Sequence, residues 1–156
     1  MNLRLALFWF LWVWMIGRAP SSAPAPSTVP STQPLAKLTV EVIDMRNHKG
    51  HLIFGVFAQK DGFPSDSSKS VNWQVKSIDA DKVVFTCELP PGRYGASILH
   101  DENANNKMDT NFLGIPKEGY GVTNNPKPKR RSATFAESLF TLPPEGATMT
   151  ISLQYF

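Results

Sequence analysis

The sequence predicts an all-β domain, an antiparallel β-sandwich of about seven strands with Greek-key connections. Apolar and polar residues alternate with a period of two in one segment after another, and turns rich in Pro and Gly separate these segments. The same part of the chain shows no long apolar pattern of helical period, and only residues 132–137 suggest a single helical turn. Short strands with regular turns are typical of β-sandwiches.

The first 34 residues differ in composition and are expected to precede this domain. Residues 5–17 are an uncharged apolar run, shorter than the about 20 residues of a membrane-spanning helix. Because Arg4 precedes this run and small residues follow it, we predict a signal peptide over residues 1–18, with an uncleaved anchor as the alternative. Residues 19–34 are rich in Pro, Ser and Ala and predict a disordered, extended linker.

The domain itself is then expected over residues 35–156, with no membrane span in the mature protein. An exported protein of this kind is located in the periplasm, in the cell envelope or in the extracellular medium. The sequence does not distinguish between these three places, and it does not indicate an oligomeric state.

The charge balance gives no support for nucleic acid binding. The chain has a formal charge of +3, but Arg4 and Arg18 lie in the predicted leader. Without them 14 Lys and Arg stand against 13 Asp and Glu, a net charge of +1. One basic run remains at residues 127–131. Short charge runs are usually solvated, and binding to an anionic surface is the alternative interpretation.

Four of the predicted strands lie in the first half of the domain, at residues 37–42, 51–59, 71–78 and 82–89. The second of them has apolar residues on both faces, which indicates a central strand buried on both sides. The fourth directs Cys87 inward with its apolar neighbours. A single cysteine excludes an internal disulfide, and a buried thiol in apolar surroundings is inert.

The remaining strands are predicted at residues 93–100, 139–142 and 148–155. The connection over residues 101–137 is much longer than the others, and connections of this length are usually functional or disordered. Because it contains Phe112, Leu113, Ile115 and Tyr120, we expect apolar anchors to order it.

The start of this connection resembles a calcium loop. Oxygen-bearing side chains alternate from Asp101, and counting it as position 1 follows the EF-hand spacing of ligands. Position 6 is Asn106, which tolerates a positive φ in place of glycine. Position 12 is Phe112, which cannot ligate, so another carboxylate, from Glu118 or Glu102, must complete the set. The predicted metal ligands are Asp101, Asn103, Asn105, the Lys107 carbonyl, Asp109 and Glu118. The alternative is a ladder of Asx turns without metal.

Residues 100–121 read His-Asp-Glu-Asn-Ala-Asn-Asn-Lys-Met-Asp-Thr-Asn-Phe-Leu-Gly-Ile-Pro-Lys-Glu-Gly-Tyr-Gly. This stretch resembles the signature of the bacterial family named domain of unknown function 2141. The preceding Leu-Pro-Pro-Gly-Arg-Tyr-Gly-Ala and the later Ala-Thr-Phe-Ala-Glu-Ser also fit this family. The resemblance covers most of residues 37–156. It implies an exported bacterial protein with a transthyretin-like or immunoglobulin-like sandwich, and it implies no activity. The family usually has Gly where this chain has Asn106.

No catalytic motif is present in the sequence. It contains no nucleophile elbow, no HExxH motif and no phosphate-binding glycine loop, so we predict no enzyme, no catalytic residues and no organic cofactor. We expect a binding module that acts through residues 101–124 on an unknown protein or envelope component, with calcium as a candidate ligand. The alternatives are a structural envelope domain with a metal-free loop, and a hydrolase that uses His100 and nearby carboxylates.

Overall fold

The computed structural model describes residues 34–127 and 131–156, which belong to one compact unit, Thr32–Phe156. The predicted signal peptide and residues 19–33 of the predicted linker lie outside the described residues. Among the described residues, every member of the hydrophobic core lies between Ala36 and Leu153, so we expect this unit to fold without the preceding residues. In the described part, no helix is long and apolar enough to cross a membrane.

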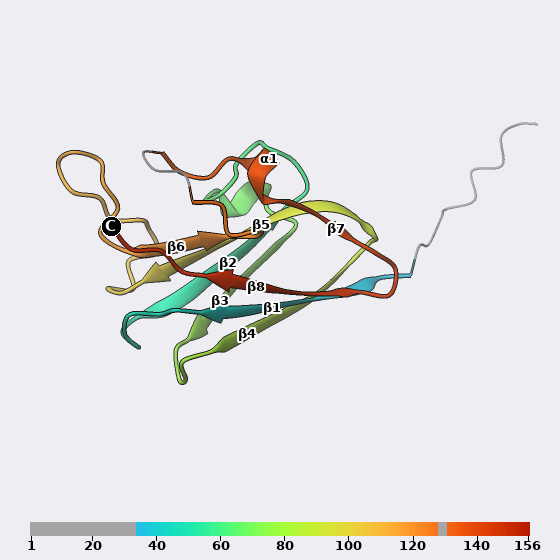
Figure 1. Ribbon diagram of the computed structural model, residues 1–156, viewed down its shortest axis with the longest axis horizontal. Coiled ribbons are helices and arrows are strands. Elements are labelled where there is room, and N and C mark those ends of the chain that lie inside the picture. The colour runs from blue at the N-terminus through green and yellow to red at the C-terminus, as the bar shows by residue number, and fades with distance from the viewer. Residues whose placement is uncertain (1–33, 128–130) are drawn as a thin grey trace, which may run out of the picture. The chain divides into compact units, whose positions relative to one another are not determined.

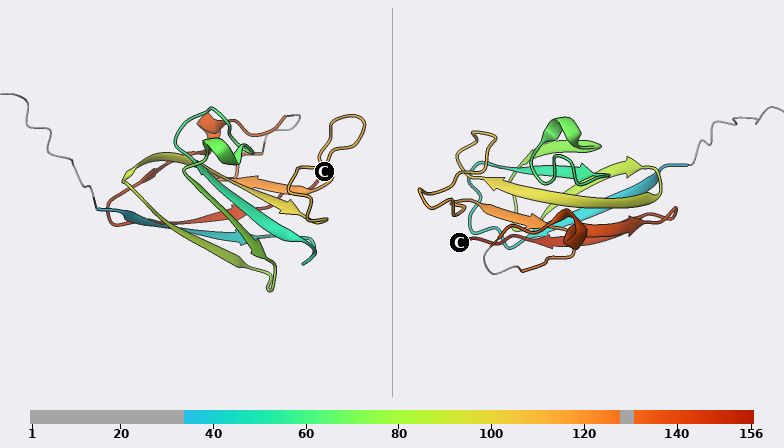
Figure 2. Two further views of the ribbon diagram at one scale, coloured as in Figure 1. Left: turned by 180° about the vertical axis from the view of Figure 1, so that it is seen from behind. Right: turned by 90° about the horizontal axis from the view of Figure 1, so that it is seen from above.

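Two β-sheets pack face to face, as Figures 1 and 2 show. The smaller sheet has the strand order β4-β1-β8, and the larger has the order β3-β2-β5-β6, with β7 paired to the first part of β5. In the described residues the strands are β1 (Ala36–Ile43), β2 (His51–Phe57), β3 (Asn72–Ser77), β4 (Val83–Leu89), β5 (Gly92–Asp101), β6 (Gly119–Val122), β7 (Leu139–Leu142) and β8 (Ala147–Ser152).

The predicted all-β sandwich is confirmed, with two differences in detail. Eight strands are present among the described residues, because Gly119–Val122 within the long connection pairs with β5. The pairing is not wholly antiparallel, because β8 crosses back from the other sheet and runs parallel to β1. Four connections cross between the sheets and place strands distant in sequence side by side, namely β1–β2, β3–β4, β4–β5 and β7–β8.

In the part of the chain that the structure describes, two short helices lie in the connections. The predicted helical turn is present as α1 (Phe135–Ser138), where Thr134 and Glu137 form a reciprocal capping box that satisfies the first backbone N–H groups. A 3-10 turn, η1 (Ser67–Lys69), follows β2, and the Asp66 side chain caps it by accepting the Ser68 N–H.

The core lies between the two sheets and follows the predicted alternation. Phe54 of β2 stacks on Phe85 of β4 across the sandwich, with ring centroids 5.0 Å apart. Cys87 belongs to this core, and burial raises the pKa of its thiol to about 11, as expected for a space-filling cysteine. The side chains that face each other here belong to β1, β2, β4, β5 and β8: Leu38, Val40, Val42, Leu52, Phe54, Val56, Val83, Phe85, Leu89, Ala96, Ile98 and Ile151.

The large sheet is also covered on its outer face. As predicted, β2 is central and buried on both sides, between β3 and β5. On the outer side Phe63 contacts both Phe57 and Phe135 edge to face, with centroid distances of 5.4 and 5.5 Å. The cover stops at the edge strand β3, where Val75 is 49% exposed, so the apolar face predicted for residues 71–78 is turned partly to solvent.

A matched pair of phenylalanine substitutions tests this division between core and surface. Phe54→Ala removes a ring with 0% exposure, so we expect a loss of about 3–5 kcal/mol in the free energy of unfolding. Phe112→Ala removes a ring that is 95% exposed, so we expect a change below about 0.5 kcal/mol. Urea unfolding followed by circular dichroism measures both values. Equal losses would contradict the packing described above.

Candidate functional site

Strands β5 and β6 hold the two ends of the long loop. β5 ends at Asp101, β6 begins at Gly119, and the two strands pair antiparallel. The side chain of Asp101 is fully buried, and a buried carboxylate requires hydrogen-bond donors. Its Oδ1 accepts the Asn105 N–H at 3.1 Å, and its Oδ2 accepts the Asn106 N–H at 2.6 Å. The first turn of the loop is therefore wound around this carboxylate.

His51 lies beside the same carboxylate. It is the cross-strand partner of Asp101 on β2, and its Nε2 is 3.1 Å from Asp101 Oδ2. The buried ring nitrogen is not aligned for a hydrogen bond, although the distance is that of an ion pair. The contact is therefore electrostatic when His51 carries a proton, and it adds no hydrogen bond.

A second buried carboxylate closes the loop. The carboxylate of Glu118, which is 4% exposed, accepts the N–H of Glu102 through Oε1 and the N–H of Asp109 through Oε2, both at 3.0 Å. These donors lie at the beginning and in the middle of the loop, so Glu118 joins both to the start of β6. Asp101 and Glu118 together satisfy four backbone N–H groups of the loop.

Between these carboxylates the polar side chains form a ladder of Asx turns. The Asn103 Oδ1 accepts the Asn105 N–H at 3.1 Å, and the Asn105 Oδ1 accepts the Lys107 N–H at 2.8 Å. The amide groups of Asn103 and Asn105 then donate to Asp109, at 2.6 and 3.2 Å. Asn106 has a φ of +62°, so it takes the left-handed conformation expected at the sixth position.

The structure therefore brings all six predicted calcium ligands into one loop. Asp101, Asp109, Glu118 and the two asparagines direct oxygens toward N–H groups of the loop itself, and Lys107 takes part through its backbone. Residues 34–127 and 131–156 contain no group of three or more His, Cys, Asp or Glu arranged to hold a metal ion. Asx turns account for the observed hydrogen bonds, and calcium binding stays a prediction.

An ion pair between Arg46 and Glu102 stabilises the base of the loop. The Arg46 guanidinium donates to both Glu102 carboxylate oxygens, at 2.6 and 2.8 Å, and to the Lys117 carbonyl at 2.9 Å. The hydrogen bond from Arg46 holds the pKa of Glu102 below its ordinary value. The guanidinium also lies over the Tyr155 ring, 4.7 Å from its centroid. Arg46 thus ties the two ends of the loop to the β1–β2 turn.

His100, the candidate catalytic residue, belongs to a buried hydrogen-bond chain. Its Nε2 donates to the Lys49 carbonyl at 2.9 Å, which leaves Nδ1 to accept the Tyr155 hydroxyl at 2.7 Å. The Tyr155 hydroxyl in turn accepts the Arg46 N–H at 3.1 Å, and burial raises the pKa of this tyrosine. His100 is 0% exposed, so neither ring nitrogen is available to a substrate.

A cavity of about 280 Å³ lies between the outer face of the large sheet and the loop. One wall consists of the loop, at residues 106–108 and 116, together with β6, at residues 120–122. The floor comes from the sheet, with Ile53, Trp73, Ser97 and Leu99, and the remaining sides are Pro64, Ser65, Ser132 and Ala133. This cavity escaped the sequence analysis, because no local pattern shows that these segments meet.

Trp73 can lie over the sheet because its cross-strand partner is a glycine. Gly55 pairs with Trp73, and a Cβ added to it would lie 2.9 Å from the indole ring and 2.9 Å from the Phe57 ring. Ser97 completes this side of the cavity, since its hydroxyl donates to the Pro64 carbonyl at 2.7 Å and fixes the connection after β2 to the sheet.

The apolar residues of the loop do not anchor it as expected. Phe112, Leu113 and Ile115 are 95%, 68% and 42% exposed, and of the four predicted anchors only Tyr120 is partly buried. The prediction of apolar anchors was wrong at these three positions. The Asx ladder and the two buried carboxylates already order the loop, so its apolar side chains are not needed for that purpose.

A small β-sandwich with one long, hydrogen-bonded loop is the class of protein that this fold and site define. A family model described as "Uncharacterized protein conserved in bacteria (DUF2141)" matches residues 40–151. The chain therefore belongs to this family, as the resemblance in its sequence predicted. Comparison with curated proteins and with solved structures found no match.

Two aspartates of the loop provide a matched test of its hydrogen bonding. Asp101→Ala removes a buried acceptor of two backbone N–H groups, so we expect a loss of about 1–3 kcal/mol in the free energy of unfolding. Asp109→Ala removes a carboxylate that accepts only side-chain amides, so we expect a loss below about 1 kcal/mol. Urea unfolding of both variants measures this difference. A larger loss for Asp109→Ala would contradict the central position given to Asp101.

Proposed function

We propose that this protein is an exported binding module, and that its ligand is a small, mainly apolar molecule with one anionic group. The cavity beside the 101–124 loop is the observation that carries this proposal. Its volume of about 280 Å³ is close to the lower end of the range for ligand pockets, about 300–1,000 Å³. Because the loop forms one of its walls, the proposal keeps the binding role expected for residues 101–124.

The lining of the cavity favours an apolar ligand. Ile53, Trp73, Leu99, Met108 and Val122 contribute aliphatic, aromatic and thioether surface. Pockets of this composition bind by removing apolar surface from water, and a few polar groups then orient the ligand. Met108 suits this role because its flexible thioether adapts to ligands of different shape.

The polar groups at the cavity favour an anion. Lys107 lines the wall, is exposed, and forms no ion pair with any residue in the described part of the chain. Arg131 lies next to the lining residue Ser132, but Glu137 holds it through two hydrogen bonds of 2.8 Å. Lys107 is therefore the cation that we assign to the anionic group of the ligand.

The loop is ordered by its own hydrogen bonds before any ligand arrives. The buried carboxylates of Asp101 and Glu118 fix the backbone on both sides of Lys107 and Met108. A wall that is already ordered loses little conformational entropy on binding, which favours affinity for a small ligand. The geometry gives a hydrolase less support, since His100 is buried with both nitrogens engaged, and we propose no enzymatic activity.

Calcium is a second candidate ligand, at a different place in the same loop. The specific observation in its favour is the left-handed Asn106 at the sixth position, which gives the sharp turn that a calcium loop requires. With few carboxylates and no ligand at the twelfth position, the expected affinity is that of weak extracellular modules, about 10⁻⁴–10⁻³ M.

Trp73 provides a direct test of the cavity, because it is the only tryptophan of residues 32–156. Titration of the Thr32–Phe156 protein with decanoate is expected to change the Trp73 fluorescence in a saturable way. Decanol, which lacks the charge, is expected to bind at least several-fold more weakly, and Lys107→Gln is expected to remove this preference. Ala133→Phe, which fills the cavity from its side, is expected to abolish the response.

Two controls make the fluorescence result decisive. Val84→Ala changes an exposed side chain on the other sheet and is expected to leave the titration unchanged. The Ala133→Phe protein must retain a cooperative unfolding transition. A flat titration up to the solubility limit, or the same response in Ala133→Phe, would refute the proposed ligand site.

Calcium binding is tested separately by thermal unfolding. If calcium binds the native loop with the affinity given above, a concentration ten times the dissociation constant is expected to stabilise the protein by about 1.4 kcal/mol. Magnesium serves as the control ion, and Asp109→Asn is expected to remove the effect while keeping the shape of the side chain. A melting temperature that is independent of calcium would support the metal-free alternative.

A further inference from the structure

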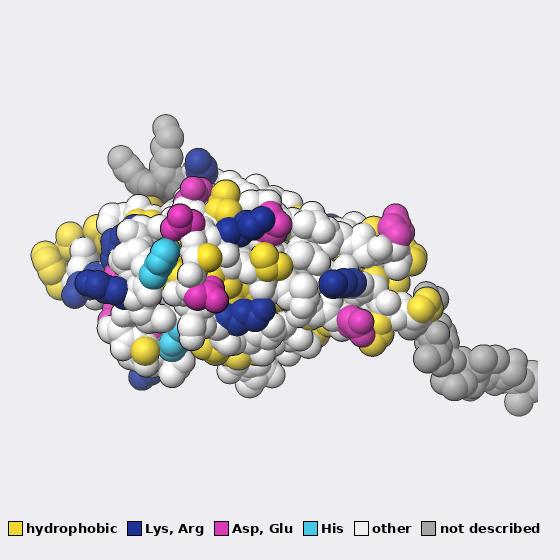
Figure 3. Space-filling view, turned by 90° about the horizontal axis from the view of Figure 1, so that it is seen from below, with side chains coloured by type: hydrophobic (Ala, Val, Ile, Leu, Met, Phe, Trp, Pro, Cys, Tyr) yellow, Lys and Arg dark blue, Asp and Glu magenta, His cyan; other side chains and the backbone are white. Residues whose placement is uncertain are grey.

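The tip of the long loop, residues 110–116, projects three apolar side chains into solvent. Phe112 is 95% exposed, Leu113 is 68% exposed and Ile115 is 42% exposed. In Figure 1 this loop stands away from the sandwich at the end where β5 finishes, and in Figure 3 hydrophobic side chains form the outermost group at that end. Exposed apolar groups of this kind mark sites that bind proteins or membranes.

Hydrogen bonds hold these side chains in their exposed positions. Thr110 and Pro116 form an isolated antiparallel bridge, and the Asn111 N–H donates to the Ile115 carbonyl at 2.9 Å. The Asn111 Oδ1 accepts the N–H groups of Leu113 and Ile115, at 2.9 and 3.0 Å. The tip is therefore a closed turn with its own polar interior, and its apolar side chains are directed outward by the backbone.

The negative side chains of the loop are turned inward, and its positive side chains are exposed. Its carboxylates are turned inward, because Asp109 and Glu118 accept hydrogen bonds within the loop and Glu102 is held by Arg46. Lys107 and Lys117, on either side of the tip, are exposed and form no ion pair with any residue in the described ranges. The loop thus presents apolar groups flanked by cations.

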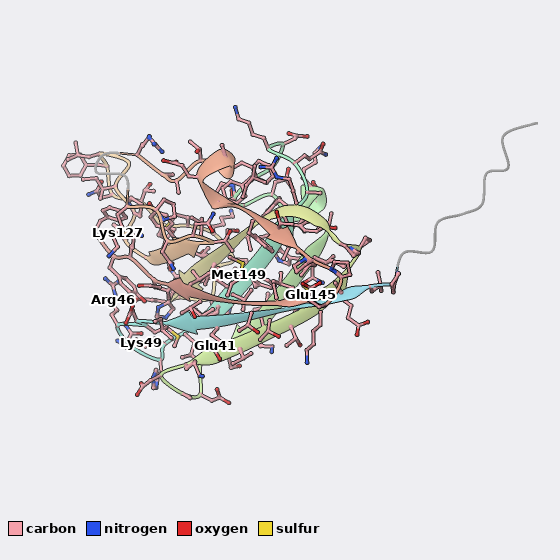
Figure 4. All side chains as sticks on the ribbon, turned by 45° about the vertical axis from the view of Figure 1, so that its right-hand side comes forward. Glu41, Arg46, Lys49, Lys127, Glu145 and Met149 are labelled. Carbon is pink, nitrogen blue, oxygen red and sulfur yellow. The ribbon has the colours of Figure 1, made fainter. Side chains whose placement is uncertain are left out.

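Further cations lie at the same end of the domain. Figure 4 places Lys127, Arg46 and Lys49 along one side, and Arg46 contacts the base of the loop through the Lys117 carbonyl. One exposed carboxylate, Asp44, follows β1 at this end and accepts the Ser152 hydroxyl at 2.6 Å, whereas Asp79 and Asp81 belong to the turn after β3, at the opposite edge of the large sheet from β6.

We propose that the tip inserts into the headgroup region of a membrane surface that contains anionic lipids. A convex group of three apolar side chains matches a deformable bilayer, and the lysines beside it match the negative potential of anionic headgroups. The first strand, β1, begins at the end of the sandwich opposite to the tip (Figure 1). The three apolar side chains of the tip and Lys117 do not line the cavity, so this proposal does not depend on the cavity.

Co-sedimentation with lipid vesicles tests this assignment. The Thr32–Phe156 protein is incubated with vesicles of phosphatidylcholine alone, or with vesicles in which part of this lipid is replaced by phosphatidylglycerol. Binding is expected with the anionic vesicles, at least tenfold stronger than with the neutral ones, and it is expected to weaken as the salt concentration rises.

Three variants separate the tip from the rest of the surface. Phe112→Ala/Leu113→Ala/Ile115→Ala is expected to lower binding to anionic vesicles at least tenfold, with an unfolding midpoint that remains unchanged. Lys117→Gln/Lys127→Gln is expected to lower binding about tenfold and to reduce its salt dependence. Val71→Ala/Val75→Ala, which removes exposed apolar groups of similar kind near and on β3, is the matched control and is expected to bind normally.

Three results would overturn the proposal. Absence of binding to either vesicle would exclude the membrane as the partner, and binding unaffected by the tip variant would place the contact elsewhere. If the wild-type protein is a dimer in analytical ultracentrifugation and the tip variant is a monomer, the occupant is a second copy of the chain. Because Lys107 and the cavity are left intact in all three variants, none of these results bears on the ligand proposed above.

Discussion

The burial of Asp101 at the end of β5 is the constraint on which the loop depends. A carboxylate with no exposure to solvent, such as that of Asp101, is strongly destabilised unless donors surround it. The chain satisfies it by turning back at once, so that the N–H groups of Asn105 and Asn106 reach both oxygens. The path of the next residues follows from this turn, and Glu118 repeats the arrangement where the loop returns to the sheet.

This design exchanges the usual roles of polar and apolar residues. Loops are commonly fixed by apolar side chains that reach the core, while their polar groups face water. Here the carboxylates and amides hold the backbone, and the apolar side chains of the tip are exposed to solvent. Met108 faces the cavity and Phe112 faces solvent, although only four positions separate them on one hydrogen-bonded loop. Two surfaces of different character therefore depend on a single set of polar interactions.

The sequence was sufficient to predict the sandwich and the central position of the strand at residues 51–59, which the structure shows as β2 (His51–Phe57). Period-two alternation reports which side chains face a core, and it was reliable wherever a strand packs between the sheets. It did not reveal β6, because Gly119–Val122 is short and contains two glycines. It also misplaced Phe112 and its neighbours, since an apolar residue in a loop is equally consistent with an anchor and with an exposed contact. The cavity arises only when distant segments pack together.

The cavity lies next to the tip of the loop, so ligand binding and membrane contact would take place close together. Neither of these two proposed roles requires the other. Lys107, Met108 and Pro116 line the cavity, and they lie immediately before and at the end of the turn that carries the exposed side chains. A tip seated among lipid headgroups therefore brings this wall of the cavity close to the bilayer surface. An apolar molecule with one anionic group is itself enriched at such a surface, because its chain prefers the acyl region and its charge prefers water. Contact of the tip with a membrane would thus place the cavity where a ligand of the proposed class is most concentrated.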